Sequence, residues 1–205
     1  MVILLNNQPL IEPFSIYVPE MTFEKVLEYA TEDISCELLD GVLVIHSPAS
    51  FKHENMIKFL IKILDEFGEE TGLGTPIGSR FMMRLTEEWA PEPDIMFLSA
   101  KDQEHLKDNY LDGPASTVFE ILSKTTRVDD IEKKTPQYLK MGVKEVWLID
   151  PEKKSITIFW PDGTKLEKSE GWLASKVLTG FKIKPLWLWN IGKVSARAAM
   201  KEMGF

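Results

Sequence analysis

One short apolar segment, Val118-Phe119-Glu120-Ile121-Leu122, constrains the fold more than any other part of the chain. It is a continuous apolar run interrupted by a single acid, which is typical of a strand buried on both faces of a sheet. Such a strand needs further layers on both sides of its sheet. Two other strand-like segments, Arg80–Leu85 and Ile95–Leu98, precede it. The centre of the fold is therefore predicted to be a covered sheet.

Helical patterns lie between these strands. Apolar residues at spacings of three and four predict helices over Thr22–Ala30, with Thr22 as N-cap, and over Ser50–Thr71, which Gly72 ends. Thr135-Pro136 resembles an N-cap followed by a first helical residue, and Gly142 would stop that helix. A short closing helix is expected over Ser195–Met203.

Hairpins complete the pattern. Asp40-Gly41 separates two short apolar runs, which is a strong hairpin signal. A second hairpin joins Glu145–Ile149 to Ser155–Trp160 by a turn at Asp150-Pro151, and Thr164–Lys168 adds a strand. Strands mixed with helices and hairpins predict an α/β (α+β) fold with a mixed central sheet, and they disfavour a purely parallel one.

Composition excludes several classes of protein. The 24 Lys and Arg residues against 32 Asp and Glu give a net charge of −8, which argues against broad electrostatic capture of nucleic acid. Cys36 is the single cysteine, so an internal disulfide and a multi-cysteine zinc site are excluded. No apolar run approaches the roughly 20 residues that cross a bilayer. Met1–Leu5 lacks the features of a secretory signal. We expect a soluble, cytoplasmic protein without a membrane partner.

Two carboxylates in strands are candidates for a metal site. Asp94 stands at the entrance to a strand, directly after Pro93, and Glu120 lies in the middle of the most apolar strand. Taken alone, Asp94 reads as a turn residue and Glu120 as an exposed strand residue. Together they could meet at one point of a sheet and bind a hard divalent cation through oxygen ligands.

A run of charges follows that strand, Arg127-Val128-Asp129-Asp130-Ile131-Glu132-Lys133-Lys134. If the run is helical, Asp130, Lys134 and Tyr138 share one side at four-residue spacing, and Lys134 faces the sheet. A lysine there could orient an attacking water and balance charge in a transition state. The alternative is a solvated run of charges.

These motifs resemble the Uma-two family of restriction-endonuclease-like proteins, part of the PD-(D/E)XK nuclease superfamily. The resemblance runs from about Thr22 to Trp189. It is carried by Glu37-Leu38-Leu39-Asp40-Gly41, Ser47-Pro48, His53, Pro93-Asp94, Glu120-Ile121-Leu122-Ser123, Asp130, Lys134 and Gly142–Pro151.

The resemblance implies a single restriction-endonuclease-like domain over residues 1–205, with a core at about 22–190 and a short C-terminal helix at about 195–203. Its mixed central sheet would be flanked by helices. The resemblance also implies hydrolysis of DNA phosphodiester bonds, a divalent metal that is usually Mg²⁺, with Mn²⁺ as an alternative, and a homodimer.

The family's functional residues map onto four positions of this chain. Asp94 and Glu120 match the metal-binding acids, Glu37 matches an acid that can complete the metal shell, and Lys134 matches the catalytic lysine.

One departure affects the choice of lysine. The wider superfamily places a lysine two residues after the second acid, where this chain has Leu122. Lys134 on the following helix is the leading candidate, and Lys124 and Lys133 remain alternatives.

Other residues carry weaker signals. His53 could have a functional or a packing role, and Arg84 could contact phosphate or be solvated. Trp187 and Trp189 alternate at period two, which suggests core or dimer-interface aromatics. Ser123 lacks the His and acid partners of a serine nucleophile.

Two other functions remain open. The first is a non-catalytic nuclease-fold module for binding or assembly, whose acids are structural. The second is an RNA or nucleotide phosphodiesterase that uses the same metal site.

Overall fold

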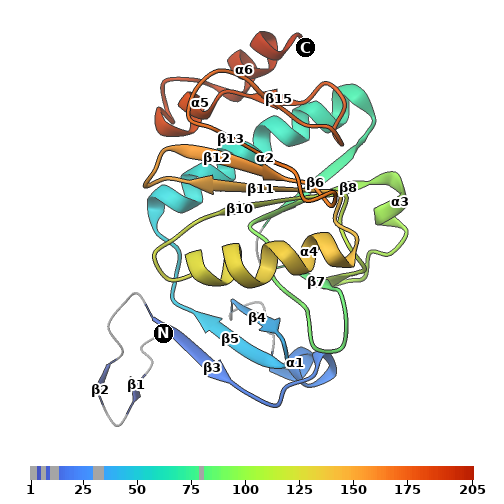
Figure 1. The fold of residues 1–205 in the computed structure, drawn as a ribbon, viewed down its shortest axis with the longest axis vertical. Helices are drawn as coiled ribbons and strands as arrows, with labels where there is room; N and C mark the ends of the chain where they lie inside the picture. Colours follow the sequence, from blue (N-terminus) through green and yellow to red (C-terminus); the bar gives the residue numbers. More distant parts are fainter. Residues whose placement is uncertain (1–3, 6–7, 10–13, 30–34, 79–80) are drawn as a thin grey trace.

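The computed structural model describes residues 4–5, 8–9, 14–29, 35–78 and 81–205 (Figure 1). At its centre is a six-stranded sheet in the order β13-β12-β11-β10-β8-β6. β10 and β11 pair in parallel, and all other neighbours are antiparallel, so the sheet is mixed as predicted. The strands are Gly74–Gly78 (β6), Ile95–Ser99 (β8), Thr117–Ile121 (β10), Glu145–Asp150 (β11), Ser155–Phe159 (β12) and Lys165–Lys168 (β13).

Helices cover both faces of this sheet (Figure 1). Phe51–Thr71 (α2) lies on one face with Pro185–Trp189 (α5) and Ala196–Met203 (α6), and Thr135–Met141 (α4) lies on the other. The side chains of β10 alternate between two clusters of buried residues. Phe119 and Ile121 pack in the α2 cluster, and Val118 packs with Tyr138 in the α4 cluster. Because side chains alternate along a strand, Glu120 faces α4 with Val118.

A smaller antiparallel sheet, in the order β3-β5-β4, lies beside the α4 face (Figure 1). Its strands are Ser15–Val18 (β3), Cys36–Leu39 (β4) and Val42–His46 (β5), and Phe23–Tyr29 (α1) precedes β4. Asp40 and Gly41 have φ angles of 54° and 73°. Positive φ at both central residues is the requirement of a type I′ turn, so the predicted hairpin is confirmed.

The remaining elements are short. Met82–Arg84 (β7) pairs in parallel with Tyr110–Asp112 (β9), outside the central sheet. The others are Leu4–Leu5 (β1), Gln8–Pro9 (β2), Ala100–Gln103 (α3), Leu173–Ala174 (β14) and Lys182–Ile183 (β15). Two of the predicted elements have an end outside the described residues: the first helix at Ala30 and one strand at Arg80.

The predicted N-cap role of Thr135 is wrong, because Thr135 is already the first residue of α4. A π-helix, Asp129–Lys134 (η1), runs directly into α4, and the Thr135 N–H donates to the carbonyl of Asp130, five residues back. The Thr135 hydroxyl donates to the same oxygen at 2.7 Å. Because this wide turn satisfies the backbone before Pro136, the helix needs no N-cap at Thr135.

Trp187 and Trp189 lie on a helix, although they alternate at period two in the sequence. Pro185 occupies the first turn of α5, where its fixed φ and missing N–H favour a helix. Trp187 is buried in the α2 cluster and Trp189 packs against that cluster, so both serve the core.

Among the described helices, none is long and apolar enough to cross a membrane.

Candidate active site

A cleft of about 500 Å³ opens between the two sheets. It is bounded by the start of α2, the loop after β10, the turn between β11 and β12, and β4 and β5 of the small sheet. All four candidate site residues, Glu37, Asp94, Glu120 and Lys134, line this cleft.

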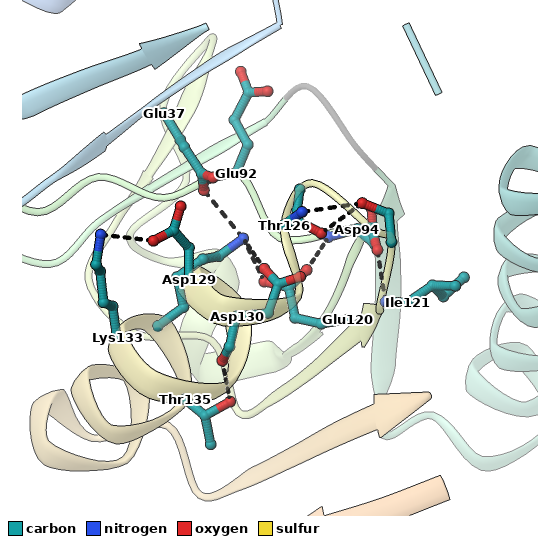
Figure 2. Close-up of polar contacts among 12 residues, drawn as sticks. Glu37, Glu92, Asp94, Glu120, Ile121, Thr126, Asp129, Asp130, Lys133 and Thr135 are labelled. Atoms are coloured by element: carbon teal, nitrogen blue, oxygen red, sulfur yellow. Dashed lines mark hydrogen bonds and ion pairs between the residues drawn. The ribbon is translucent and has the colours of Figure 1, made fainter. Parts of the chain in front are cut away.

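Lys134 lies at the centre of a buried group of carboxylates. Its Nζ atom is 2.8 Å from Glu120 Oε1, 3.1 Å from Glu37 Oε2 and 3.1 Å from Asp130 Oδ1. All four side chains are 3% exposed. Figure 2 shows the three carboxylates pointing toward one another. Burial favours a neutral amine, but the charges of Glu120 and Glu37 outweigh it and raise the pKa of Lys134 well above its ordinary value.

Glu120 is held at both oxygens. The Tyr138 hydroxyl donates to Oε1 at 2.7 Å, and the Asp94 N–H donates to Oε2 at 3.2 Å. Burial, helped by the negative charges of Asp130 and Asp94, raises the pKa of Glu120 to about 8 against the opposing effect of Lys134. The strand register explains the proximity of the two predicted acids, because Phe119 of β10 pairs with Ile95 of β8. Asp94 and Glu120 therefore meet at the end of the β8–β10 ladder.

Asp94 faces a histidine from α2. Its Oδ2 atom accepts the Ile121 N–H at 2.7 Å and lies 3.2 Å from His53 Nε2. The same imidazole nitrogen lies 3.0 Å from the Ile121 carbonyl oxygen. Burial lowers the pKa of His53, but the hydrogen bond and charge of Asp94 outweigh it and raise this pKa to about 9. The Oδ2 atom of Asp94 and the carbonyl oxygen of Ile121 therefore converge on His53 Nε2.

Glu37 joins the small sheet to the centre. His46 Nε2 lies 2.8 Å from Glu37 Oε1, and the N–H of Glu92 donates to Oε2 at 3.3 Å. Burial would raise the pKa of Glu37, but the charge of Lys134 and the hydrogen bond with His46 lower it to about 2. Both oxygens of Glu37 thus already contact cationic or N–H groups.

The alternative lysines lie elsewhere. Lys133 Nζ is 2.6 Å from Asp129, and its side chain is 52% exposed. Lys124 is exposed and lines the cleft from the loop after β10. Of the three lysines, Lys134 is the one that contacts Glu37, Glu120 and Asp130.

Two weaker candidates have structural contacts. Arg84 lies 3.1 Å from Asp112, pairs with Glu87, and is not among the residues that line the cleft. The Ser123 hydroxyl hydrogen-bonds to the hydroxyls of Thr125 and Thr126 within the loop after β10.

Sequence reasoning missed His46 and Glu92 as neighbours of this centre. Glu92 lines the cleft, and burial together with the charge of Glu37 raises its pKa to about 7. Its place in Pro91-Glu92-Pro93-Asp94 was a usable signal, because the segment already carried Asp94. His46 had no comparable signal, since it ends an ordinary strand.

Within the described residues, no three His, Cys, Asp or Glu side chains are arranged as a metal site. The chemistry of the donors nevertheless fits a hard cation. Asp94, Glu120 and the Ile121 carbonyl supply oxygen atoms, which Mg²⁺ prefers. Two of these oxygens, Asp94 Oδ2 and Ile121 O, already share one electropositive neighbour, His53.

Comparisons with known proteins agree with this fold. The chain is similar in fold to the crystal structure of "a putative nuclease belonging to DUF820" from Anabaena variabilis ATCC 29413. The TM-score is 0.71 at 15% identity, and the match covers 82% of this chain and 97% of that one. No curated protein matches the chain. The family model Uma2, described as "Putative restriction endonuclease", matches residues 23–186. Because that match spans most of the sequence, this chain belongs to the Uma2 family.

Proposed function

We propose that this protein is a metal-dependent endonuclease that hydrolyses phosphodiester bonds in DNA. Membership of the Uma2 family supports a nuclease function. The observation that carries the proposal is the convergence of Lys134 and Glu120 beside Asp94 at the bottom of one cleft.

Asp94, Glu120 and the Ile121 carbonyl would hold Mg²⁺ or Mn²⁺. When bound, such a cation lowers the pKa of a coordinated water and stabilises charge on phosphoryl oxygens. The side chains of Asp94 and His53 are 18% and 16% exposed, against 3% for Glu120 and Lys134, so a substrate phosphate would approach from their side. Glu37 as a further metal ligand stays a prediction, since its oxygens contact Lys134 and His46.

Lys134 would place its ammonium group next to the reacting phosphate. Its three carboxylate neighbours keep it protonated, so it acts as a hydrogen-bond donor and a fixed positive charge. A donor already in place needs no reorganisation when negative charge grows on the phosphate. Lys134 would also hold Glu120 in position through their 2.8 Å contact.

The test is Mg²⁺-dependent cleavage of DNA by the wild type, Asp94→Asn and Glu120→Gln. We expect cleavage by the wild type and its loss in both variants. Asp65→Asn and Glu69→Gln make the same chemical changes at exposed positions of α2 and should keep the activity. Circular dichroism checks that all four variants fold. Cleavage that survives in both site variants would contradict the assignment.

The proposal also covers the choice of DNA as substrate and the assembly of the protein as a homodimer. An RNA arm in the cleavage assay separates a DNA nuclease from an RNA phosphodiesterase with the same site. The homodimer and the cytoplasmic location stay predictions.

A further inference from the structure

The reacting groups lie deep in the cleft. Glu37, Glu120 and Lys134 are 2–3% exposed, and the Asp94 side chain is 18% exposed. Duplex DNA has to be bent or locally deformed to bring one phosphate down into a recess, and a bend of 40–90° costs about 1–6 kcal/mol. A single strand is flexible enough to bring one phosphate down to Asp94. The depth of the site thus favours an unpaired strand.

Two lysines at the cleft suit the phosphates of such a strand. Lys52 on α2 and Lys124 in the loop after β10 are both exposed and line the cleft. In the part of the chain that the structure describes, neither forms an ion pair. Unpaired lysines in a cleft are typical phosphate contacts.

The cleft as a whole is not basic. Besides Lys52, Lys124 and Lys134 it is lined by seven acids, of which Glu37, Glu92, Asp94, Glu120 and Asp130 belong to the site described above. Glu152 is paired with Arg127 at 3.2 Å, and Glu54 is the acid on α2 that shares the cleft with Lys52. With a net charge of −8, the whole chain attracts phosphate weakly. Binding therefore needs a contribution that does not depend on charge.

Phe51 can supply that contribution. It is not itself a lining residue, but it begins α2 between Ser50 and Lys52, which both line the cleft, and it is 82% exposed. This is the largest exposure among the large apolar side chains of the described residues. A base stacks on an aromatic ring only when it is unpaired, and each such contact contributes about 1–3 kcal/mol in single-strand binding proteins.

We propose that the cleft takes an unpaired polynucleotide strand, with Phe51 stacking on a base and Lys52 and Lys124 contacting the phosphates on either side of the one that reacts. The inference rests on the proposed nuclease function and specifies its substrate as a single strand or an unpaired segment.

The test measures binding by fluorescence anisotropy, with Ca²⁺ replacing Mg²⁺, for labelled oligothymidylate, oligouridylate and a duplex DNA. We expect the wild type to bind oligothymidylate at least about ten-fold more tightly than the duplex. Two phosphate contacts on a single strand predict a salt slope of about −1.4 in log K against log [salt]. The oligouridylate arm distinguishes DNA from RNA as the source of the strand.

Matched variants separate specific contacts from changes of net charge. Phe51→Ala should weaken oligothymidylate binding at least about five-fold, while Leu186→Ala, which removes an apolar side chain that is 58% exposed on α5, should not. Lys52→Ala should weaken binding and flatten the salt slope. Lys58→Ala, an exposed lysine of the same helix that does not line the cleft, should leave both unchanged.

The outcomes distinguish this inference from the proposed function. Equal binding of duplex and single strand, or equal effects of Phe51→Ala and Leu186→Ala, would overturn the inference and leave nuclease activity standing. Selective binding of the single strand without Mg²⁺-dependent cleavage of any substrate would support the inference and count against the nuclease.

Discussion

Lys134 and Glu120 form a 2.8 Å ion pair in which each side chain is 3% exposed. Removing two charges from water is unfavourable, so an ion pair this deep contributes little to stability by itself. Its importance is that loss of one partner leaves the other charge buried and unpaired. Glu37 and Asp130 add two more carboxylates that depend on the same ammonium group.

Replacement of this lysine should therefore be destabilising. We expect Lys134→Met to lower the free energy of unfolding by about 3–5 kcal/mol and to abolish Mg²⁺-dependent cleavage. Lys133→Met is the comparison variant, because Lys133 is half exposed and pairs with one buried carboxylate, Asp129, where Lys134 contacts three. Its effect should be smaller, at about 1 kcal/mol, because solvent screens the charge of Lys133. Urea denaturation measures both variants.

A double variant tests the physical reason. If unpaired carboxylates cause the loss, Lys134→Met combined with Glu37→Gln should be more stable than Lys134→Met alone. Additive losses would show that the lysine and Glu37 act independently.

Magnesium should stabilise the folded protein through Asp94. A ligand that binds the native state alone raises stability by about 2.7 kcal/mol when its concentration is about 100 times Kd. We expect the melting temperature of the wild type and of Asp65→Asn to rise with Mg²⁺ concentration, and that of Asp94→Asn to stay constant. A wild-type melting curve that Mg²⁺ does not move would favour the non-catalytic alternative.

The contact between Arg127 and Asp150 predicts a pH dependence of stability. The guanidinium lies 2.7 and 2.8 Å from the two carboxylate oxygens and lowers the pKa of Asp150 from 3.8 to about 2, against some burial. Because the folded pKa is the lower one, the contribution is complete above about pH 4 and is lost as the pH falls toward 2. Urea denaturation of the wild type and Asp150→Asn should show a stability difference that is constant near neutrality and shrinks below pH 4. A difference that stays constant down to pH 2 would contradict this.

The carboxylate of Glu145 on β11 joins the segment that contains Ser175 and Lys176 to the central sheet. It is fully buried and accepts from Trp147 Nε1, Trp160 Nε1, the Ser175 hydroxyl and the Lys176 N–H, at 2.5–2.8 Å. Glu145→Gln replaces one acceptor oxygen by a donor, so we expect a loss of at least about 2 kcal/mol. Unfolding followed by tryptophan fluorescence measures it, with the exposed Glu170→Gln as control. Equal stability of the two variants would show that the segment is held by packing alone.

Features with local signals were predictable from the sequence. The end of α2 follows from Gly72, whose φ is 66°, and the start of α6 from Ser195, whose hydroxyl accepts the Ala198 N–H. The meeting of Asp94 and Glu120 was also predictable, because adjacent strands bring residues of matching register together.

Features that depend on distant pairing were not predictable. β6 contains Pro76 between two glycines, residues that disfavour strands, and it is tolerated as the edge strand next to β8. His46 lies beside Glu37 because Glu37 pairs with Val44, two residues before His46 on the same face of the small sheet. Neither relationship appears in a local pattern of residues.

The π-helix that precedes α4 makes this centre sensitive to the length of the chain. A π-turn holds one residue more than an α-turn, and each residue of an α-helix rotates the side-chain direction by about 100°. Deletion of a single codon in this stretch, for example that of the exposed Glu132, would remove the extra residue of the π-turn and change the spacing of Asp130 and Lys134 from four residues to three. A small insertion or deletion here would therefore change the geometry around Lys134 without replacing any of the residues that contact it.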